Sequence, residues 1–186
     1  MIKWSLRHFL WLVSLPVIFQ PTMVLGELLD GVYLISQKPL AQLKNNTYYL
    51  ALSGVNEKTQ LRKLVKGSDT QKWEITNVPE GITLKNIGSN CHAYVGSLST
   101  VLPIGAPLFC SLAGTSSPEV FQSDQNADGS YQIKRFNWRD PSLFYLMHTV
   151  PLNISLEFPD VYGNISFVPF ATSFATNFRF ERLSGA

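Results

Sequence analysis

Residues that support covalent or acid–base chemistry are sparse in this chain of 186 amino acids. After residue 26 only two histidines remain, His92 and His148, and the two cysteines are Cys91 and Cys110. The sequence contains no H-E-x-x-H metal motif, no G-x-S-x-G nucleophile motif and no G-x-x-x-x-G-K-[ST] phosphate loop. Two isolated histidines supply too few ligands for a zinc site. The sequence therefore predicts a binding protein that uses no cofactor and no metal, and not an enzyme.

Residues 1–26 have the features of a secretory signal peptide. Two basic residues precede an apolar run over residues 9–19, and Val24 and Gly26 stand at the −3 and −1 places of a cleavage site. A membrane anchor needs about 20 uninterrupted apolar residues, whereas prolines and a glutamine interrupt this segment. We expect cleavage after Gly26, which leaves a secreted, extracellular domain over residues 27–186.

The two cysteines are expected to form one disulfide, because exported proteins fold in an oxidising compartment. Cys91 and Cys110 enclose 18 residues, and a loop of that size is stabilised by about 3 kcal/mol in the chain-entropy model. The alternative is a reactive thiol beside His92, which needs an unpaired thiolate where pairing is favoured. Three N-x-[ST] sequons predict surface glycosylation, at Asn45, Asn153 and Asn164.

The predicted mature chain carries no formal net charge. Of the 15 basic side chains 13 follow residue 26, and so do all 13 acidic ones. Binding to nucleic acid or to anionic lipid needs a basic excess gathered on one face. We therefore expect no nucleic-acid partner, and no membrane partner once the signal peptide is removed. The one basic cluster, residues 62–66, fits a solvated strand edge.

Strand patterns fill nearly all of the chain after residue 26. Apolar and polar residues alternate at Tyr131 and Ile133, and again over residues 154–158, as they do in half-buried strands. Turns rich in glycine, asparagine and aspartate separate these strands, and no window has a convincing helical stripe. The pattern predicts an antiparallel all-β sandwich or barrel in a single domain.

A threefold repetition is visible along the chain. An acidic residue and a glycine precede a strand three times, at Gly31, Gly81 and Gly129, which lie 50 and 48 residues apart. Each unit ends near a large aromatic residue. A period of about 50 residues indicates a self-similar architecture. The closing aromatic residues, which we expect to be buried in a shared core, are Trp73, Phe121 and Phe178.

These residues resemble the ricin-type β-trefoil (ricin B-like lectin) family. Gln71-Lys72-Trp73 looks like the family's Q-x-W signature, although the other two places read Glu119-Val120-Phe121 and Thr176-Asn177-Phe178. The cysteines of the second unit bracket a strand and a G-x-P turn, as they do in the family. The resemblance implies an all-β fold, a β-trefoil with three pseudo-symmetric repeats of about 50 residues.

The resemblance also implies carbohydrate binding. In this family an aspartate two places after the first cysteine holds the sugar hydroxyls, and an aromatic residue stacks on the ring. The aspartate place is Ala93 here, which offers no charge-assisted hydrogen bond, so we expect degenerate sites that bind simple galactosides weakly or not at all. The candidate carbohydrate-binding residues are Asn90 and Phe109 in the second repeat, and Tyr162 and Asn164 in the third.

Two other functions fit the same resemblance. Kunitz-type and mycocypin protease inhibitors use a trefoil whose exposed loops enter the protease cleft, and the candidate loops here are residues 96–105, 113–118 and 137–142. A secreted effector-like interaction protein would use the trefoil as a scaffold alone. The expected partner is therefore a glycan or glycoprotein, and alternatively a protease.

Overall fold

The computed structural model describes residues 27–37, 47–96, 106–112, 117–137, 140–151, 161–169 and 176–184. The predicted signal peptide over residues 1–26 lies outside these ranges, as do the sequon residues Asn45 and Asn153. Among the described residues no helix is long and apolar enough to cross a membrane.

Strands make up nearly all of the regular structure, as the alternating pattern predicted, and in the described part of the chain the one helical element is a 3-10 turn. Their bounds are β1 Gly31–Gln37, β2 Tyr48–Ala51, β3 Gln60–Lys63, η1 Asp69–Gln71, β4 Lys72–Val78, β5 Gly81–Asn86, β6 Cys91–Val95, β7 Ala106–Leu112, β8 Gln122–Gln125, β9 Tyr131–Asn137, β10 Asp140–Pro151, β11 Val161–Pro169 and β12 Phe178–Arg182.

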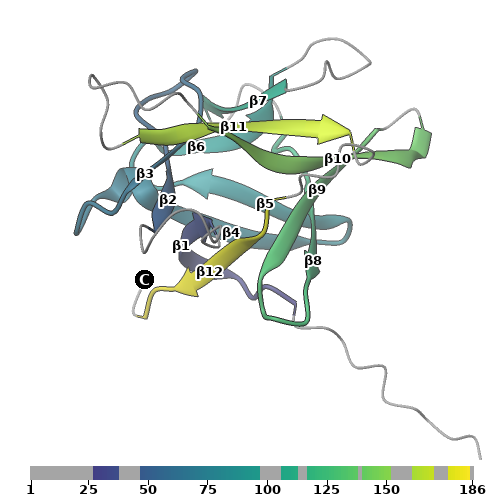
Figure 1. The fold of residues 1–186 in the computed structure, drawn as a ribbon, viewed down its shortest axis with the longest axis horizontal. Coiled ribbons are helices and arrows are strands. Elements are labelled where there is room, and N and C mark those ends of the chain that lie inside the picture. Colours follow the sequence, from purple (N-terminus) through teal and green to yellow (C-terminus); the bar gives the residue numbers. More distant parts are fainter. Residues whose placement is uncertain are drawn as a thin grey trace, which may run out of the picture.

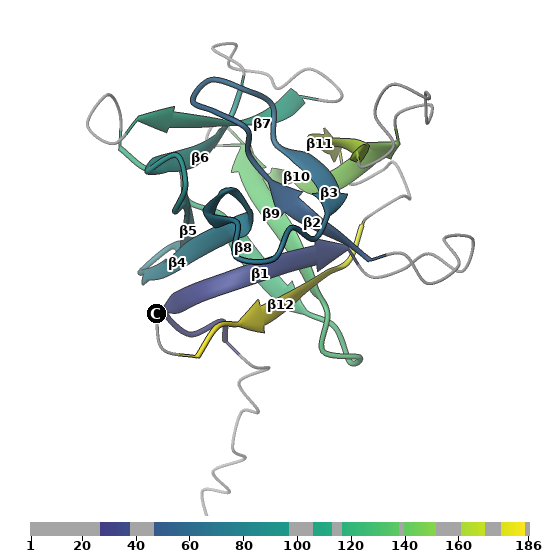
Figure 2. The same ribbon diagram turned by 90° about the vertical axis from the view of Figure 1, so that its left-hand side faces the viewer.

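The strands form one antiparallel sheet that closes on itself. Their order is β10-β9-β12-β1-β2-β3-β11-β7-β6-β5-β4, with β8 against β9. Two further pairings, β1 with β4 and β10 with β11, join the ends of this path back to its interior (Figures 1 and 2). The pairing of β1 with β12, from Tyr33 opposite Arg182 to Gln37 opposite Phe178, lays the two ends of the described chain side by side.

The three closing aromatic residues lie in the core, as predicted. Trp73 and Phe178 are fully buried and Phe121 is 1% exposed. Alternation along β4 places Trp73 and Ile75 inside and leaves Lys72 and Glu74 half-exposed. The indole Nε1 of Trp73 donates a hydrogen bond of 3.0 Å to the Leu50 carbonyl oxygen, so the one polar atom of the buried ring has a partner.

The predicted strand-opening glycines hold different positions. Gly31 and Gly81 are the first residues of β1 and β5, but Gly129 lies in the turn two residues before β9. At Gly81, φ is +149° and a side-chain Cβ would come within 2.1 Å of the Phe121 carbonyl oxygen. Only glycine permits this approach of two backbone segments.

The residues two places before the closing aromatics each make a hydrogen bond to another segment. Gln71, which is 2% exposed, accepts from the Val65 N–H and donates to the Lys63 carbonyl oxygen. Glu119 accepts from the Val95 N–H and forms an ion pair with Arg135. The Thr176 hydroxyl is 3.0 Å from Nδ1 of His148. The glutamine of the Q-x-W signature thus fixes a turn at the end of β3.

Glu119 provides a test of this role. Glu119→Ala removes the acceptor of the Val95 N–H, whose residue is buried, and one charged partner of Arg135, and should lower the free energy of unfolding by about 1–3 kcal/mol. Glu119→Gln keeps an acceptor and loses a partly exposed ion pair, a change of about 1 kcal/mol or less. Urea unfolding measures both, with the exposed Glu80→Ala as the matched control. Equal midpoints for Glu119→Ala and the unmodified chain would contradict the assignment.

Candidate functional site

The strands β6 and β7 form a hairpin joined by a disulfide. Their register runs from Cys91 opposite Leu112 to Val95 opposite Leu108. Cys91 and Cys110 are both fully buried and disulfide-bonded, with Cα atoms 5.5 Å apart. The predicted disulfide is therefore present, and it links two inward-facing positions of neighbouring strands.

The two faces of this hairpin differ sharply in burial. Ala93, Leu108 and Cys110 face the core and are at most 1% exposed. Tyr94 and Phe109, which are directly opposite each other, are half-exposed on the outer face. Because successive side chains of a strand point to opposite faces, Phe109 and Ala93 do not line one site. The expected combination of an aromatic platform with position 93 is therefore wrong.

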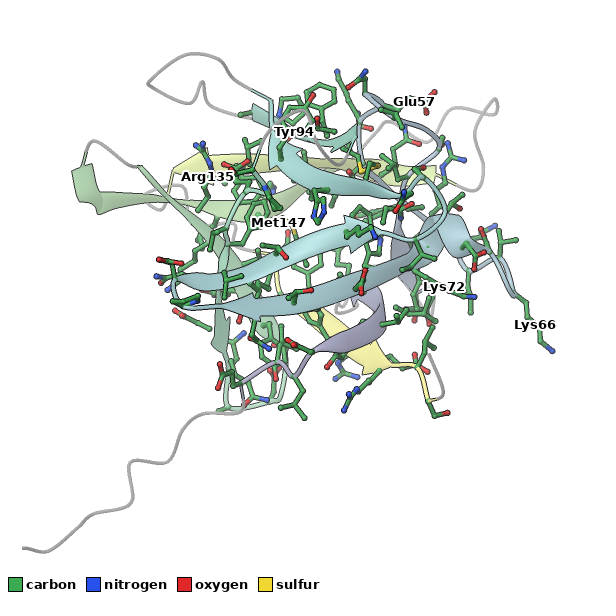
Figure 3. The ribbon with its side chains drawn as sticks, turned by 180° about the vertical axis from the view of Figure 1, so that it is seen from behind. Glu57, Lys66, Lys72, Tyr94, Arg135 and Met147 are labelled. Carbon is green, nitrogen blue, oxygen red and sulfur yellow. A yellow bond between two sulfur atoms is a disulfide. The ribbon has the colours of Figure 1, made fainter. Side chains whose placement is uncertain are left out.

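Tyr94 and Phe109 form a stacked aromatic pair on the outer face. Their ring centroids are 5.7 Å apart and the ring planes are 26° from parallel. The Phe109 ring lies directly against the Gly96 backbone, where a Cβ would be 2.1 Å from its Cε2 atom. Lys58, in the segment before β3, lies opposite Phe109 in an antiparallel backbone pairing. In the same segment the Asn56 and Thr59 N–H groups donate to the carbonyl oxygens of Cys110 and Leu108 in β7. The aromatic pair is thus held in place from both sides, and Tyr94 can be seen at the upper edge of Figure 3.

A row of polar side chains runs beside the aromatic pair. Glu74, Lys85, His92 and Ser111 lie opposite one another in turn across β4, β5, β6 and β7. The Lys85 Nζ atom is 3.6 Å from the Glu74 Oε2 atom. Burial in the first place, and then the Lys85 charge, lower the pKa of His92 below its usual value, while Glu74 acts in the opposite direction. Near neutral pH the imidazole is therefore uncharged, and its Nδ1 atom is buried with no hydrogen-bond partner among the described residues.

An apolar ring face beside neutral and charged hydrogen-bonding groups suits a ligand with both characters. A pyranose ring has an apolar C–H face, which packs on an aromatic ring, and hydroxyls at its rim, which need donors and acceptors. Among the described residues no three His, Cys, Asp or Glu side chains gather closely enough to hold a metal ion. The outer face of β6 and β7 thus offers stacking and hydrogen bonding.

The other predicted site residues are not brought to this face. Asn90 is exposed in the turn before β6, with φ +47°, and residues 91–93 separate it from the aromatic pair. Tyr162 is 7% exposed and stacks on Tyr48 at 5.0 Å, so it is a core residue. Asn164 is half-buried on β11, and its Oδ1 accepts a hydrogen bond of 3.2 Å from Gln60 Nε2. Only Phe109 of the four lies in the aromatic pair.

Sequence reasoning missed Tyr94 as a site residue. The alternation of faces along a strand could have identified it. Tyr94 stands one place after Ala93, and Phe109 one place before Cys110, so both aromatic side chains point away from the face that Ala93 and Cys110 take. The loops proposed for protease inhibition lie largely outside the described residues.

No protein-family model and no curated protein matches the chain. Several solved structures are similar in fold, among them a designed protein and two lectins. ThreeFoil, a designed 3-fold symmetric protein, has a TM-score of 0.60 at 14% identity, over 83% of this chain and 100% of that one. The Macrolepiota procera ricin B-like lectin, in complex with lactose, has a TM-score of 0.57 at 12% identity, over 85% of this chain and 100% of the lectin chain. The Polyporus squamosus lectin, bound to a human-type influenza-binding epitope, has a TM-score of 0.53 at 15% identity, over 85% of this chain and 51% of the lectin chain.

The chain has a ricin-type β-trefoil fold. At identities of 12–15% the likeness concerns the path of the backbone and not the side chains of a binding site. A binding site on this chain therefore follows from its own side chains and not from those of the similar structures.

Proposed function

We propose that this trefoil is a secreted glycan-binding protein whose ligand stacks on the Tyr94–Phe109 pair. Residues 1–26 act as the signal peptide, and the partner is a glycan or a glycoprotein. The chain works as a binder and not as an enzyme. Its own N-linked glycans are attached at the predicted sequons, Asn45, Asn153 and Asn164.

The observation that carries the proposal is the aromatic pair itself. Large aromatic rings are normally buried, and in this chain Trp73, Phe121 and Phe178 all are. Tyr94 and Phe109 instead lie half-exposed on a hairpin held by a disulfide and by the segment around Lys58. A rigid ring platform gives stacking energy without an ordering cost on binding.

The same geometry supports the prediction of weak binding to simple galactosides. Ala93 is 1% exposed and faces the core, so the inner face of the hairpin has neither a carboxylate nor access for a sugar there. On the outer face the hydrogen-bonding groups are Glu74, Lys85, His92 and Ser111, and the Glu74 carboxylate lies 3.6 Å from the Lys85 ammonium group. A ligand that extends beyond one sugar ring gains more from this surface than a monosaccharide does.

The proposal includes three pseudo-symmetric repeats that end at Trp73, Phe121 and Phe178. What supports them is the similar placing of Gln71, Glu119 and Thr176, each of which hydrogen-bonds another segment two places before a buried aromatic. In this scheme β6 and β7 are the second and third strands of the second repeat.

Phe109→Ala is expected to lower binding on a glycan array by about five- to twelvefold, because a stacking contact of about 1–1.5 kcal/mol corresponds to that factor. Circular dichroism confirms that the variant is folded. Tyr49→Ala, which removes another half-exposed strand aromatic, is the matched control and should bind as the unmodified chain does. Titration of lactose and N-acetylgalactosamine should give dissociation constants weaker than about 1 mM.

Three results would count against the proposal or a part of it. An array on which the folded, unmodified chain binds no glycan contradicts the function. Binding that survives both Phe109→Ala and Tyr94→Ala contradicts the site, and lactose binding tighter than about 1 mM contradicts the account of Ala93.

A further inference from the structure

The turn between β3 and η1 exposes two aliphatic side chains at a tip. Leu64 is 48% exposed and Val65 is 61% exposed. Lys66 follows them and lies at the outer end of the loop that projects from the body, well apart from Tyr94 (Figure 3). The two side chains together form a small apolar patch with polar residues at its rim, an arrangement that interaction sites often show.

The tip is held in one conformation by buried and local contacts. The Gln71 side chain accepts from the Val65 N–H at 2.7 Å and donates to the Lys63 carbonyl oxygen at 2.8 Å. The Ser68 N–H donates to the Val65 carbonyl oxygen at 3.1 Å, and Gly67, with φ +80°, closes the turn. Leu64 and Val65 are therefore presented by a braced turn.

The segment that carries the tip is strongly basic. Residues 62–72 contain four basic side chains, Arg62, Lys63, Lys66 and Lys72, and one acidic side chain, Asp69. Asp69 is engaged by Lys72, whose Nζ atom is 2.7 Å from its Oδ1 atom. The predicted mature chain is neutral as a whole, so this segment concentrates positive charge beside two exposed aliphatic side chains.

We propose that the tip, residues 62–72, docks on an anionic phospholipid surface. Leu64 and Val65 enter the boundary between headgroups and acyl chains, and the surrounding basic side chains contact lipid phosphates, which is how apolar and basic residues combine at membrane interfaces. Charge complementarity and the convex shape of the tip favour a lipid surface as the occupant. This departs from the expectation of no membrane partner, because the sequence did not show that Leu64 and Val65 would be exposed.

Co-sedimentation with vesicles tests the proposal. The mature chain should pellet with vesicles of phosphatidylcholine that contain about 30% phosphatidylserine, and not with phosphatidylcholine alone. The double variant Leu64→Ser/Val65→Ser should bind at least about fivefold more weakly, because two apolar side chains no longer enter the bilayer. Lys66→Gln should also lose about fivefold, the usual effect of one basic residue near an anionic surface. Leu29→Ser, at another aliphatic residue with 60% exposure, is the matched control and should bind normally.

The vesicles contain no glycolipid, so the outcome is independent of the proposed glycan site. No pelleting of the unmodified chain overturns the proposal, even if the same turn is found to bind a protein. Pelleting that is unchanged by Leu64→Ser/Val65→Ser also overturns it, because the apolar end of the tip would then have no part in binding.

Discussion

Replacing Trp73 with alanine is expected to lower the free energy of unfolding by about 3–5 kcal/mol. The ring is fully buried at the start of β4, and its Nε1 atom donates to the Leu50 carbonyl oxygen. Alanine removes the ring, leaves a cavity in the core and leaves that carbonyl without this donor. The loss is a large part of the roughly 5–15 kcal/mol by which a native domain is stable.

Urea unfolding followed by circular dichroism measures this effect. Trp73→Phe keeps most of the apolar volume and loses the hydrogen bond, so its midpoint should lie between those of Trp73→Ala and the unmodified chain. Thr76→Ala, at an exposed position of the same strand, is the matched control and should stay within about 0.5 kcal/mol. A midpoint unaffected by Trp73→Ala would refute the assignment of Trp73 to the core.

Removing the disulfide is expected to have the second largest effect. Cys91→Ala/Cys110→Ala opens a loop of 18 enclosed residues, and the expected loss is about 3 kcal/mol, within a general range of about 2–5 kcal/mol. Both sulfurs face the core, so the variant also loses a little buried volume on the inner side of the hairpin.

The same unfolding experiment detects the loss, and thiol labelling of the denatured, unmodified chain should find no free thiol. Phe109→Ala alone should leave the disulfide intact. A double variant as stable as the unmodified chain, or two titratable thiols in the purified protein, would contradict the role given to the disulfide.

Local pattern was enough to predict the strands, the disulfide and the three buried aromatics. Alternation at period two identifies strands wherever one face is buried, and β4 with Trp73 and Ile75 inside is an example. Two cysteines in a chain with a predicted signal peptide leave one pairing. These features depend on neighbours in sequence or on a simple count.

The site was predicted less well because it depends on which face a residue takes. Phe109 was grouped with Ala93, but the pairing of Ala93 with Cys110 and of Tyr94 with Phe109 puts them on opposite faces. Tyr162 was expected at the surface. It stands where the pairing of β11 with β3 shifts register between Val161 and Gly163, and it lies in the core. A bulge changes the parity of a strand and is not visible in a hydropathy pattern.

The hydrogen bonds of individual side chains were also beyond the sequence. Nothing local indicates that Gln71 braces the turn carrying Leu64 and Val65, or that Glu119 bonds the Val95 N–H and pairs with Arg135. The Glu119 contacts join separate segments whose approach is set by the closed sheet, and the Gln71 contacts depend on the path of one turn.

The central claim is that a glycan binds on the outer face of β6 and β7, and chemical-shift mapping tests it most directly. The isotope-labelled mature chain is titrated with the glycan that binds best on the array. The account predicts the largest shift changes at residues 92–96 and 107–111, which flank the Tyr94–Phe109 pair. Changes confined to residues 162–168, with none at the hairpin, would contradict it.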